Sequence, residues 1–161
     1  MKRDGYFQIL WIRIGFRMQT FLPYPGFQES ARVLDYKRLG KQRVEAMQIL
    51  NIVSGGVPDS RWKNHPAVKM WVGYENALKA YTNAMIREWI DRGYNNSMVL
   101  YNAGRIEYPW WFGNENFHRS HRSRLIQKNK EFYLPLFPDD DGYNGYKYFW
   151  PDNDSRKFRV I

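Results

Sequence analysis

The chain has no cysteine among its 161 residues, and this absence excludes several kinds of site. Disulfide bonds, thiolate nucleophiles, and zinc or iron–sulfur sites built on cysteine all need that side chain. A long apolar run is missing as well, because Gln8 and Arg13 interrupt the short apolar stretch of residues 6–16. Such a stretch fits neither a secretory signal nor a membrane span. We therefore expect a cytoplasmic protein with no membrane partner.

Histidine is scarce, with three in the chain, at positions 65, 118 and 121. His118 and His121 would share one face of a helix, as some metal sites require. The sequence has no His-Glu-x-x-His motif, however, and the arginines beside these histidines would repel a divalent cation. We therefore expect phosphate-binding histidines and no metal. The motifs of a serine nucleophile elbow, a Walker loop and a dinucleotide-binding loop are also missing.

Acidic residues are outnumbered by basic ones, 16 to 25, which gives a formal net charge of +9. A surplus of this size favours a polyanionic partner through phosphate contacts and counterion release, although solubility alone would also account for it. Aromatic residues make up 18% of the chain, with seven Trp and twelve Tyr, and flat rings can stack on bases as well as fill a core. Charge and rings together indicate a nucleic-acid partner.

The length and the apolar pattern predict one helical domain. A chain of this length can bury a core without a metal or disulfide staple. Residues 1–17 differ from the rest and are interpreted as an N-terminal extension, either an upstream-start artefact or a short strand or arm. The domain proper is expected over residues 18–161. Its helices are predicted from Ser30 or Asp35 to about Val53, from Pro66 to Asp91, and over residues 119–130.

The remaining segments, residues 94–117 and 132–150, are rich in aromatic residues, glycine and proline and are expected to form ordered loops. The predicted fold class is all-α: a compact single-domain helical fold with long, irregular, aromatic-rich loops, present as a monomer. Two charges interrupt its apolar faces, Arg43 on the first helix and Glu75 on the second. Unpaired buried charges are costly, so we expect an Arg43–Glu75 ion pair unless both side chains reach water.

The first helix carries the first candidate site. Arg38, Lys41, Gln42 and Glu45 fall on one polar arc, beside Gly40, which permits close approach of a ligand to the backbone. Glu45 could act as a general base or stabilise a cationic sugar transition state, with Arg38 and Lys41 on the flanking phosphates. The alternative is a solvated helix face with an ordinary pair between Lys41 and Glu45.

The second candidate site follows a Pro-Trp-Trp-Phe-Gly loop. Trp110 and Trp111 could wedge into a base stack or support an extruded base, or they could simply fill the core. A run of basic and polar residues comes next and offers phosphate contacts. Its proposed contacts are His118, Arg119, His121, Arg122 and Arg124.

From Met18 onward the chain resembles the pyrimidine-dimer DNA glycosylases of the phage endonuclease V type, as a divergent member. Three blocks carry the resemblance. The segment Leu39-Gly40-Lys41-Gln42-Arg43-Val44-Glu45 is similar to the family's first-helix Leu-Gly-x-x-Arg-Glu segment. The stretch from His65 to Trp89-Ile90-Asp91-Arg92-Gly93-Tyr94 is similar to its long helix ending in Arg-Gly-aromatic. The basic helix and the aromatic tail form the third block.

The resemblance implies cleavage of a damaged base's glycosidic bond, then strand scission at the abasic site, with no cofactor. In the family the N-terminal α-amine attacks the sugar C1′ and forms a Schiff base, and an α-amine titrates near pH 8, about where this chemistry needs it. A domain that begins at Met18 would supply that amine, with Glu45 as the assisting carboxylate and Arg43 as the matching arginine. Val44 separates these two residues, which therefore point about 200° apart on a helix, so Arg38 or Gln42 is the better helper.

We therefore expect a DNA-repair glycosylase, DNA-associated, that acts on a damaged or modified base in double-stranded DNA, with abasic-site lyase activity. One alternative is a non-catalytic nucleic-acid-binding module, for DNA or RNA, that has lost the amine nucleophile. The other is a glycosidase for free nucleosides, which has little use for so large a positive charge.

Overall fold

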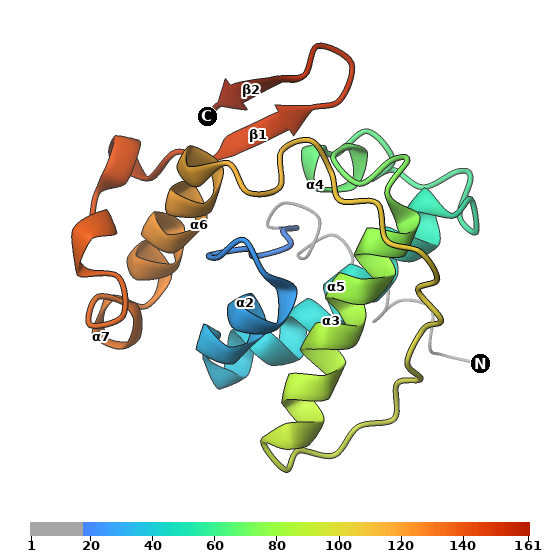
Figure 1. The fold of residues 1–161 in the computed structure, drawn as a ribbon, viewed down its shortest axis with the longest axis horizontal. Helices are drawn as coiled ribbons and strands as arrows, with labels where there is room; N and C mark the ends of the chain where they lie inside the picture. The colour runs from blue at the N-terminus through green and yellow to red at the C-terminus, as the bar shows by residue number, and fades with distance from the viewer. Residues whose placement is uncertain (1–17) are drawn as a thin grey trace.

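The computed structural model describes residues 18–161; the predicted extension over residues 1–17 lies outside the described residues. The described part is mainly helical and compact, which confirms the all-α prediction. Figure 1 shows the helices around a central segment that leads from residue 18 into the first of them. The helices are α2 (Phe27–Val33), α3 (Tyr36–Val53), α4 (Pro66–Lys69), α5 (Glu75–Asp91), α6 (Glu115–Lys128) and α7 (Lys130–Tyr133).

A short C-terminal hairpin was not expected from the sequence. Strands β1 (Phe149–Asp152) and β2 (Lys157–Val160) pair antiparallel and lie beside α6 in Figure 1. Two 3-10 turns, η1 (Pro138–Asp140) and η2 (Tyr143–Tyr146), connect α7 to the hairpin. No helix among residues 18–161 is long and apolar enough to cross a membrane.

Helix α3 begins after Asp35 and ends at Val53, close to the predicted boundaries. Its carboxylate neighbour Asp35 does not cap the helix but pairs with Arg38, 3.1 Å away, and accepts a hydrogen bond from the Tyr133 hydroxyl. Leu39 and Leu50 are buried in the core, where α3 packs against α5. Of the two predicted starts, Asp35 therefore matches the observed helix, whereas Ser30 belongs to the separate helix α2.

The predicted helix from Pro66 to Asp91 is wrong as one continuous element. It divides into α4 and α5, separated by a turn at Gly73, whose φ of 88° is left-handed and incompatible with a helix. Glu75 therefore stands in the first turn of α5, exposed to solvent, where a carboxylate favours the helix dipole. The apolar pattern is helical on both sides of Gly73, but the turn at this glycine separates the two helices.

The predicted Arg43–Glu75 ion pair is wrong for the same reason. Arg43 instead donates from Nη1 to Asn96 Oδ1, 3.1 Å away, and its guanidinium lies 4.0 Å from the centre of the Trp89 ring. Stacking on an aromatic face and an amide acceptor accommodate the cation without a carboxylate. Arg43 is therefore fixed on the α5 side of α3, away from Glu45.

Helix α6 begins four residues earlier than predicted. The side chain of Asn114 accepts a hydrogen bond from the Phe117 backbone N, 3.1 Å away, and so caps the helix. Asn129 plays the same part for α7, where it accepts from the Phe132 N at 3.2 Å. Because Asn129 begins a new helix, the aromatic residues Phe132 and Tyr133 do not continue α6.

Candidate active site

Residues 19–23 run through the middle of the molecule without helix or strand structure, drawn blue between α6 and the α3/α5 pair in Figure 1. The backbone of this segment forms hydrogen bonds with side chains of the surrounding helices and not with a strand in the described part of the chain. Gln42 of α3 accepts from the Phe21 backbone N at 2.8 Å and donates from Nε2 to the Gln19 carbonyl at 3.0 Å. The Tyr81 hydroxyl of α5 donates to the Phe21 carbonyl at 2.9 Å. The first described residues are therefore held in one position relative to α3.

Glu45 lies where this segment begins. Its Oε2 accepts a hydrogen bond from the Gln19 backbone N at 3.4 Å and one from Gln42 Nε2 at 3.1 Å. Only 7% of Glu45 is exposed, and burial raises the pKa of its carboxyl to about 7, although these hydrogen bonds and the charges of Lys41 and Lys128 act in the opposite direction. A carboxyl with this pKa can give and take a proton near neutral pH.

Two cations stand near that carboxyl, from two helices. Lys41 of α3 and Lys128 of α6 are exposed, and both lower the pKa of Glu45 through their charge. The alternative interpretation, a solvated pair of Lys41 with Glu45, is wrong, because Glu45 is buried and no ion pair joins the two among the described residues. The arrangement is a buried acid with basic side chains outside it.

Most polar residues of α6 that were predicted to bind nucleic acid instead hold residues 22 and 23. His121 Nδ1 accepts from the Leu22 N at 2.9 Å, and His118 Nδ1 lies 2.8 Å from the Leu22 carbonyl. The His118 ring donates there, because its Nε2 accepts from the Gly113 N. Burial lowers the pKa of both imidazoles. Both rings are enclosed, so the structure does not bring them to a phosphate-binding surface.

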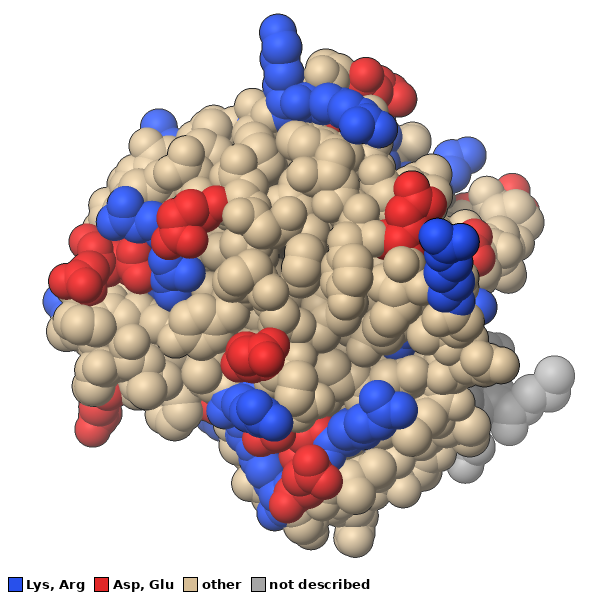
Figure 2. Space-filling view, viewed as in Figure 1, with Lys and Arg blue, Asp and Glu red and all other residues tan. Residues whose placement is uncertain are grey.

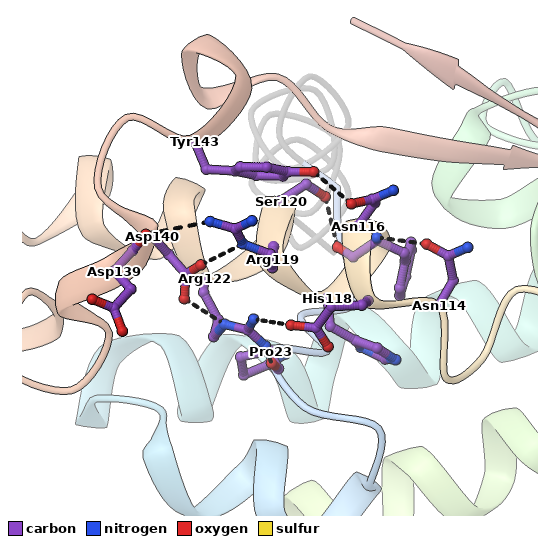
Figure 3. Close-up of polar contacts among 12 residues, drawn as sticks. Pro23, Asn114, Asn116, His118, Arg119, Ser120, Arg122, Asp139, Asp140 and Tyr143 are labelled. Carbon is purple, nitrogen blue, oxygen red and sulfur yellow. Dashed lines mark hydrogen bonds and ion pairs between the residues drawn. The ribbon is translucent and has the colours of Figure 1, made fainter.

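Two arginines of α6, Arg119 and Arg122, form an ion-pair network, shown in Figure 3. Asp140 of η1 accepts from Arg122 Nε at 2.7 Å and from Arg119 Nε at 2.8 Å. Arg122 also donates to the Pro23 carbonyl at 2.8 Å and to Glu115 at 2.7 Å. The Arg119 guanidinium lies 4.0 Å from the centre of the Tyr143 ring. These cations are engaged within the protein, and Arg122 is buried.

The tryptophans of the predicted wedge divide between core and surface. Trp111 is fully buried, with its ring centroid 5.1 Å from that of Trp71 and its Nε1 donating to the Met70 carbonyl. The core alternative therefore describes Trp111. Trp110 is half-buried and donates from Nε1 to Asn153 Oδ1 at 2.9 Å. It packs beside the hairpin, so the two indoles do not share a surface.

The histidines predicted as a rival metal site do not meet. His65 caps α4, where its Nδ1 accepts from the Ala67 N at 3.0 Å, while the other two enclose Leu22. Among residues 18–161 no group of three or more histidine, aspartate or glutamate side chains is placed to hold a metal ion.

The net charge of +9 is not gathered on the face shown in Figure 2, where acidic and basic side chains stand beside each other around a largely uncharged centre. Three residues near Glu45 were not predicted from the sequence: Gln19, Lys128 and Tyr148. The signal for Lys128 was available, because it follows Arg124 by four residues on one helix face. Nothing in the sequence pointed to Gln19 or Tyr148, which reach the site from segments without a regular pattern.

Comparison with known families gives one finding. The model of a family described as pyrimidine dimer DNA glycosylase matches residues 18–102, just over half of the chain. The match begins at Met18 and includes Gln42, Glu45 and Tyr81, while α6 and the hairpin lie beyond it. Neither curated proteins nor solved structures gave a match.

Proposed function

The chain belongs to the pyrimidine dimer DNA glycosylase family, and we propose that it excises a damaged pyrimidine from duplex DNA and then cuts the strand at the abasic site. The family's substrate is DNA, and its members are repair enzymes. The observation that supports the proposal is the contact of Glu45 with the backbone N of Gln19. It brings an acid with a pKa of about 7 to within one residue of Met18.

In a polypeptide that begins at Met18, the α-amine would lie one residue from this contact. Consecutive Cα atoms are only about 3.8 Å apart, so Glu45 and the amine would serve the same sugar. An α-amine with a pKa near 8 is partly neutral at physiological pH, and its lone pair can attack a carbon. Gln42 and Tyr81 hold the segment that carries the amine, which limits the entropy lost when the sugar is aligned.

The proposed first step is displacement at the sugar C1′. The amine lone pair forms the new C1′–N bond, and the electron pair of the glycosidic bond leaves with the base, which takes up a proton. Opening of the sugar ring and loss of the amine proton give the Schiff base. Removal of a C2′ proton then expels the 3′-phosphate. Glu45 donates a proton while it is neutral and accepts one while it is ionised, as its pKa allows.

The phosphates that flank the lesion would meet Lys41 and Lys128. These exposed cations come from two helices on the Glu45 side of the core, and their charges already reach the carboxyl. Phosphate contacts of this kind position the strand without reading its sequence.

Borohydride trapping tests the proposal, because reduction of a Schiff base leaves a covalent protein–DNA adduct. Protein begun at Met1 and protein begun at Met18 are incubated with a duplex containing a thymine dimer or an abasic site. We expect an adduct with the Met18 form, and its loss when the Met18 amine is acetylated. Glu45→Gln should slow base release by at least about a hundredfold, because one proton-transfer group is removed. Equal cleavage by Glu45→Gln would contradict the role of this carboxyl.

One observation favours a second candidate function. Glu45 is only 7% exposed in this conformation, which gives a bulky sugar little direct access to its carboxyl. A non-catalytic DNA-binding module would need no such access. It predicts tight, salt-dependent binding to duplex DNA with no adduct from either form of the protein.

A further inference from the structure

The C-terminal hairpin extends outward from the Glu45 site. Tyr148 immediately precedes β1, and its phenol is close enough to Glu45 for the two to interact: burial raises the pKa of the phenol, and the charge of Glu45 raises it further. The four residues of β1 reach about 13 Å beyond Tyr148, at about 3.3 Å per residue. This length matches about four base pairs of duplex DNA, at about 3.4 Å each.

One face of the hairpin carries cations without an ion-pair partner. In the strand register Trp150 lies opposite Arg159, and Asp152 lies opposite Lys157, so these four side chains share a face. Lys157 and Arg159 are exposed, and neither forms an ion pair within the described part of the chain. Asp152 instead accepts from the Asp154 backbone N at 3.0 Å. Basic side chains project from the top of the molecule in Figure 2, where Figure 1 places the hairpin.

A row of half-buried rings joins this face to the segment before α4. The ring centroid of Trp150 lies 6.1 Å from that of His65, which in turn lies 6.4 Å from that of Trp62. Arg61 and Lys63, the chain neighbours of Trp62, are exposed as well. Rings with cations at both ends of the row are typical of surfaces that bind nucleic acid, because rings pack on sugars and bases while cations bind phosphates.

We propose that the hairpin face, with Trp150, Lys157 and Arg159, and the ring row that continues to Trp62 bind the DNA strand beside the lesion. The occupant follows from charge and position, since the surface offers unpaired cations to a polyanion and begins at the candidate active site. The family match ends at residue 102, so the hairpin lies outside the matched segment. This inference rests on the proposed function and adds to it a second contact surface for the same substrate.

The double variant Lys157→Gln, Arg159→Gln tests the surface. Its affinity for a duplex with a central thymine dimer is measured over a series of salt concentrations. We expect the slope of log affinity against log salt to fall by about 2, one for each lost phosphate contact, and the affinity near physiological salt to fall about tenfold or more. The matched control is Arg32→Gln, Arg87→Gln, which removes two exposed cations from the helix pair α2 and α5 and should leave the slope nearly unchanged.

A second measurement shortens the DNA and leaves the protein intact. Two further duplexes end about two base pairs from the dimer, one on each side, so that each lacks part of the length that the hairpin spans. On one of them the unsubstituted protein should bind as weakly as the hairpin variant, and on the other the difference between them should persist. Equal slopes for the two double variants, or a difference that persists on both shortened duplexes, would overturn the inference. Borohydride trapping reports on the proposed function separately, because tight binding without an adduct contradicts excision and leaves the slopes to decide on the surface.

Discussion

Two groups of polar side chains hold the same segment, residues 19–23, and they differ in how completely they are satisfied. On α6, the buried side chains of His118, His121 and Arg122 find acceptors and donors within the protein, including the backbone of Leu22 and Pro23. Around Glu45, the carboxyl is desolvated and the buried side-chain oxygen of the neighbouring Gln48 has no hydrogen-bond partner. The α6 group is complete as it stands, and the Glu45 group is not.

The completeness of hydrogen bonding distinguishes a group of polar side chains that supports the fold from one that binds a ligand better than the number of charges does. By sequence the α6 run is the more basic of the two, yet Asp140 and Glu115 neutralise its inner arginines. The Glu45 group has fewer charges but retains unmet hydrogen-bonding capacity and a shifted pKa, which is typical of sites that bind a ligand or a transition state. We therefore expect substitutions in the two groups to have opposite consequences for stability.

The largest expected effect is on the complete group. Asp140→Asn should destabilise the protein by about 3 kcal/mol or more, because it removes the carboxylate partner of the half-buried Arg119 and one of the two carboxylate partners of the buried Arg122. Denaturant unfolding at neutral pH measures the change. Asp141→Asn is the control and should change stability little. The Asp141 carboxylate is exposed to solvent, and it lies 3.6 Å from the Lys130 ammonium. Equal effects of the two substitutions would show that the network is not what anchors η1 to α6.

The Glu45 group should instead respond to pH. Because the folded protein holds the carboxyl proton up to a pKa of about 7 and the unfolded chain releases it near 4.5, the folded state binds more protons between these values. Stability therefore falls as pH rises from 4.5 to 7, by up to about 3 kcal/mol. Glu45→Gln should remove this dependence and be more stable than the unsubstituted protein at pH 8. A variant that is less stable at pH 8 would show that the ionised carboxylate is needed for folding.

A structural feature could be predicted from the sequence where residues close to it in the chain determine it. The apolar period of α3 was sufficient to predict its boundaries, although the Asp35 side chain does not cap it, and the Leu-Gly-Lys-Gln-Arg-Val-Glu block led to Glu45. Gly73 was passed over, because an apolar pattern continues on both sides of it and only the left-handed φ reveals the turn. The hairpin escaped for a similar reason, since four-residue strands provide little periodicity.

The burial of the basic run on α6 could not be predicted from residues close to it in the chain. Whether His118, His121 and Arg122 face solvent or core depends on Leu22, about a hundred residues earlier in the chain, and on Asp140, which follows in a turn. The same holds for Trp111, whose position is decided by Trp71. Contacts between distant segments thus turned a predicted surface into part of the core.

The α6 group should show the reverse pH dependence. Burial lowers the pKa of His121 well below its ordinary value of 6.5, and that of His118 falls as well. Below pH 6.5 the unfolded chain therefore binds more protons than the folded protein, so stability falls as the solution becomes more acidic. His121→Asn keeps an acceptor near the Leu22 N and cannot be protonated there, so it should flatten the acid side of the stability profile. An unchanged acid side would assign the loss to other groups.

The smallest expected effect concerns DNA affinity, and it compares the two groups directly. Lys41 is exposed on the Glu45 side, whereas Arg119 is bound to Asp140 and Tyr143. Removing one cation that binds a phosphate should lower the slope of log affinity against log salt by about 1, so Lys41→Gln should flatten the salt dependence of duplex binding by about that amount. Arg119→Gln should leave the slope unchanged and lower stability instead. If Arg119→Gln flattens the slope and Lys41→Gln does not, the DNA lies along α6, and the ion pair with Asp140 opens when DNA binds.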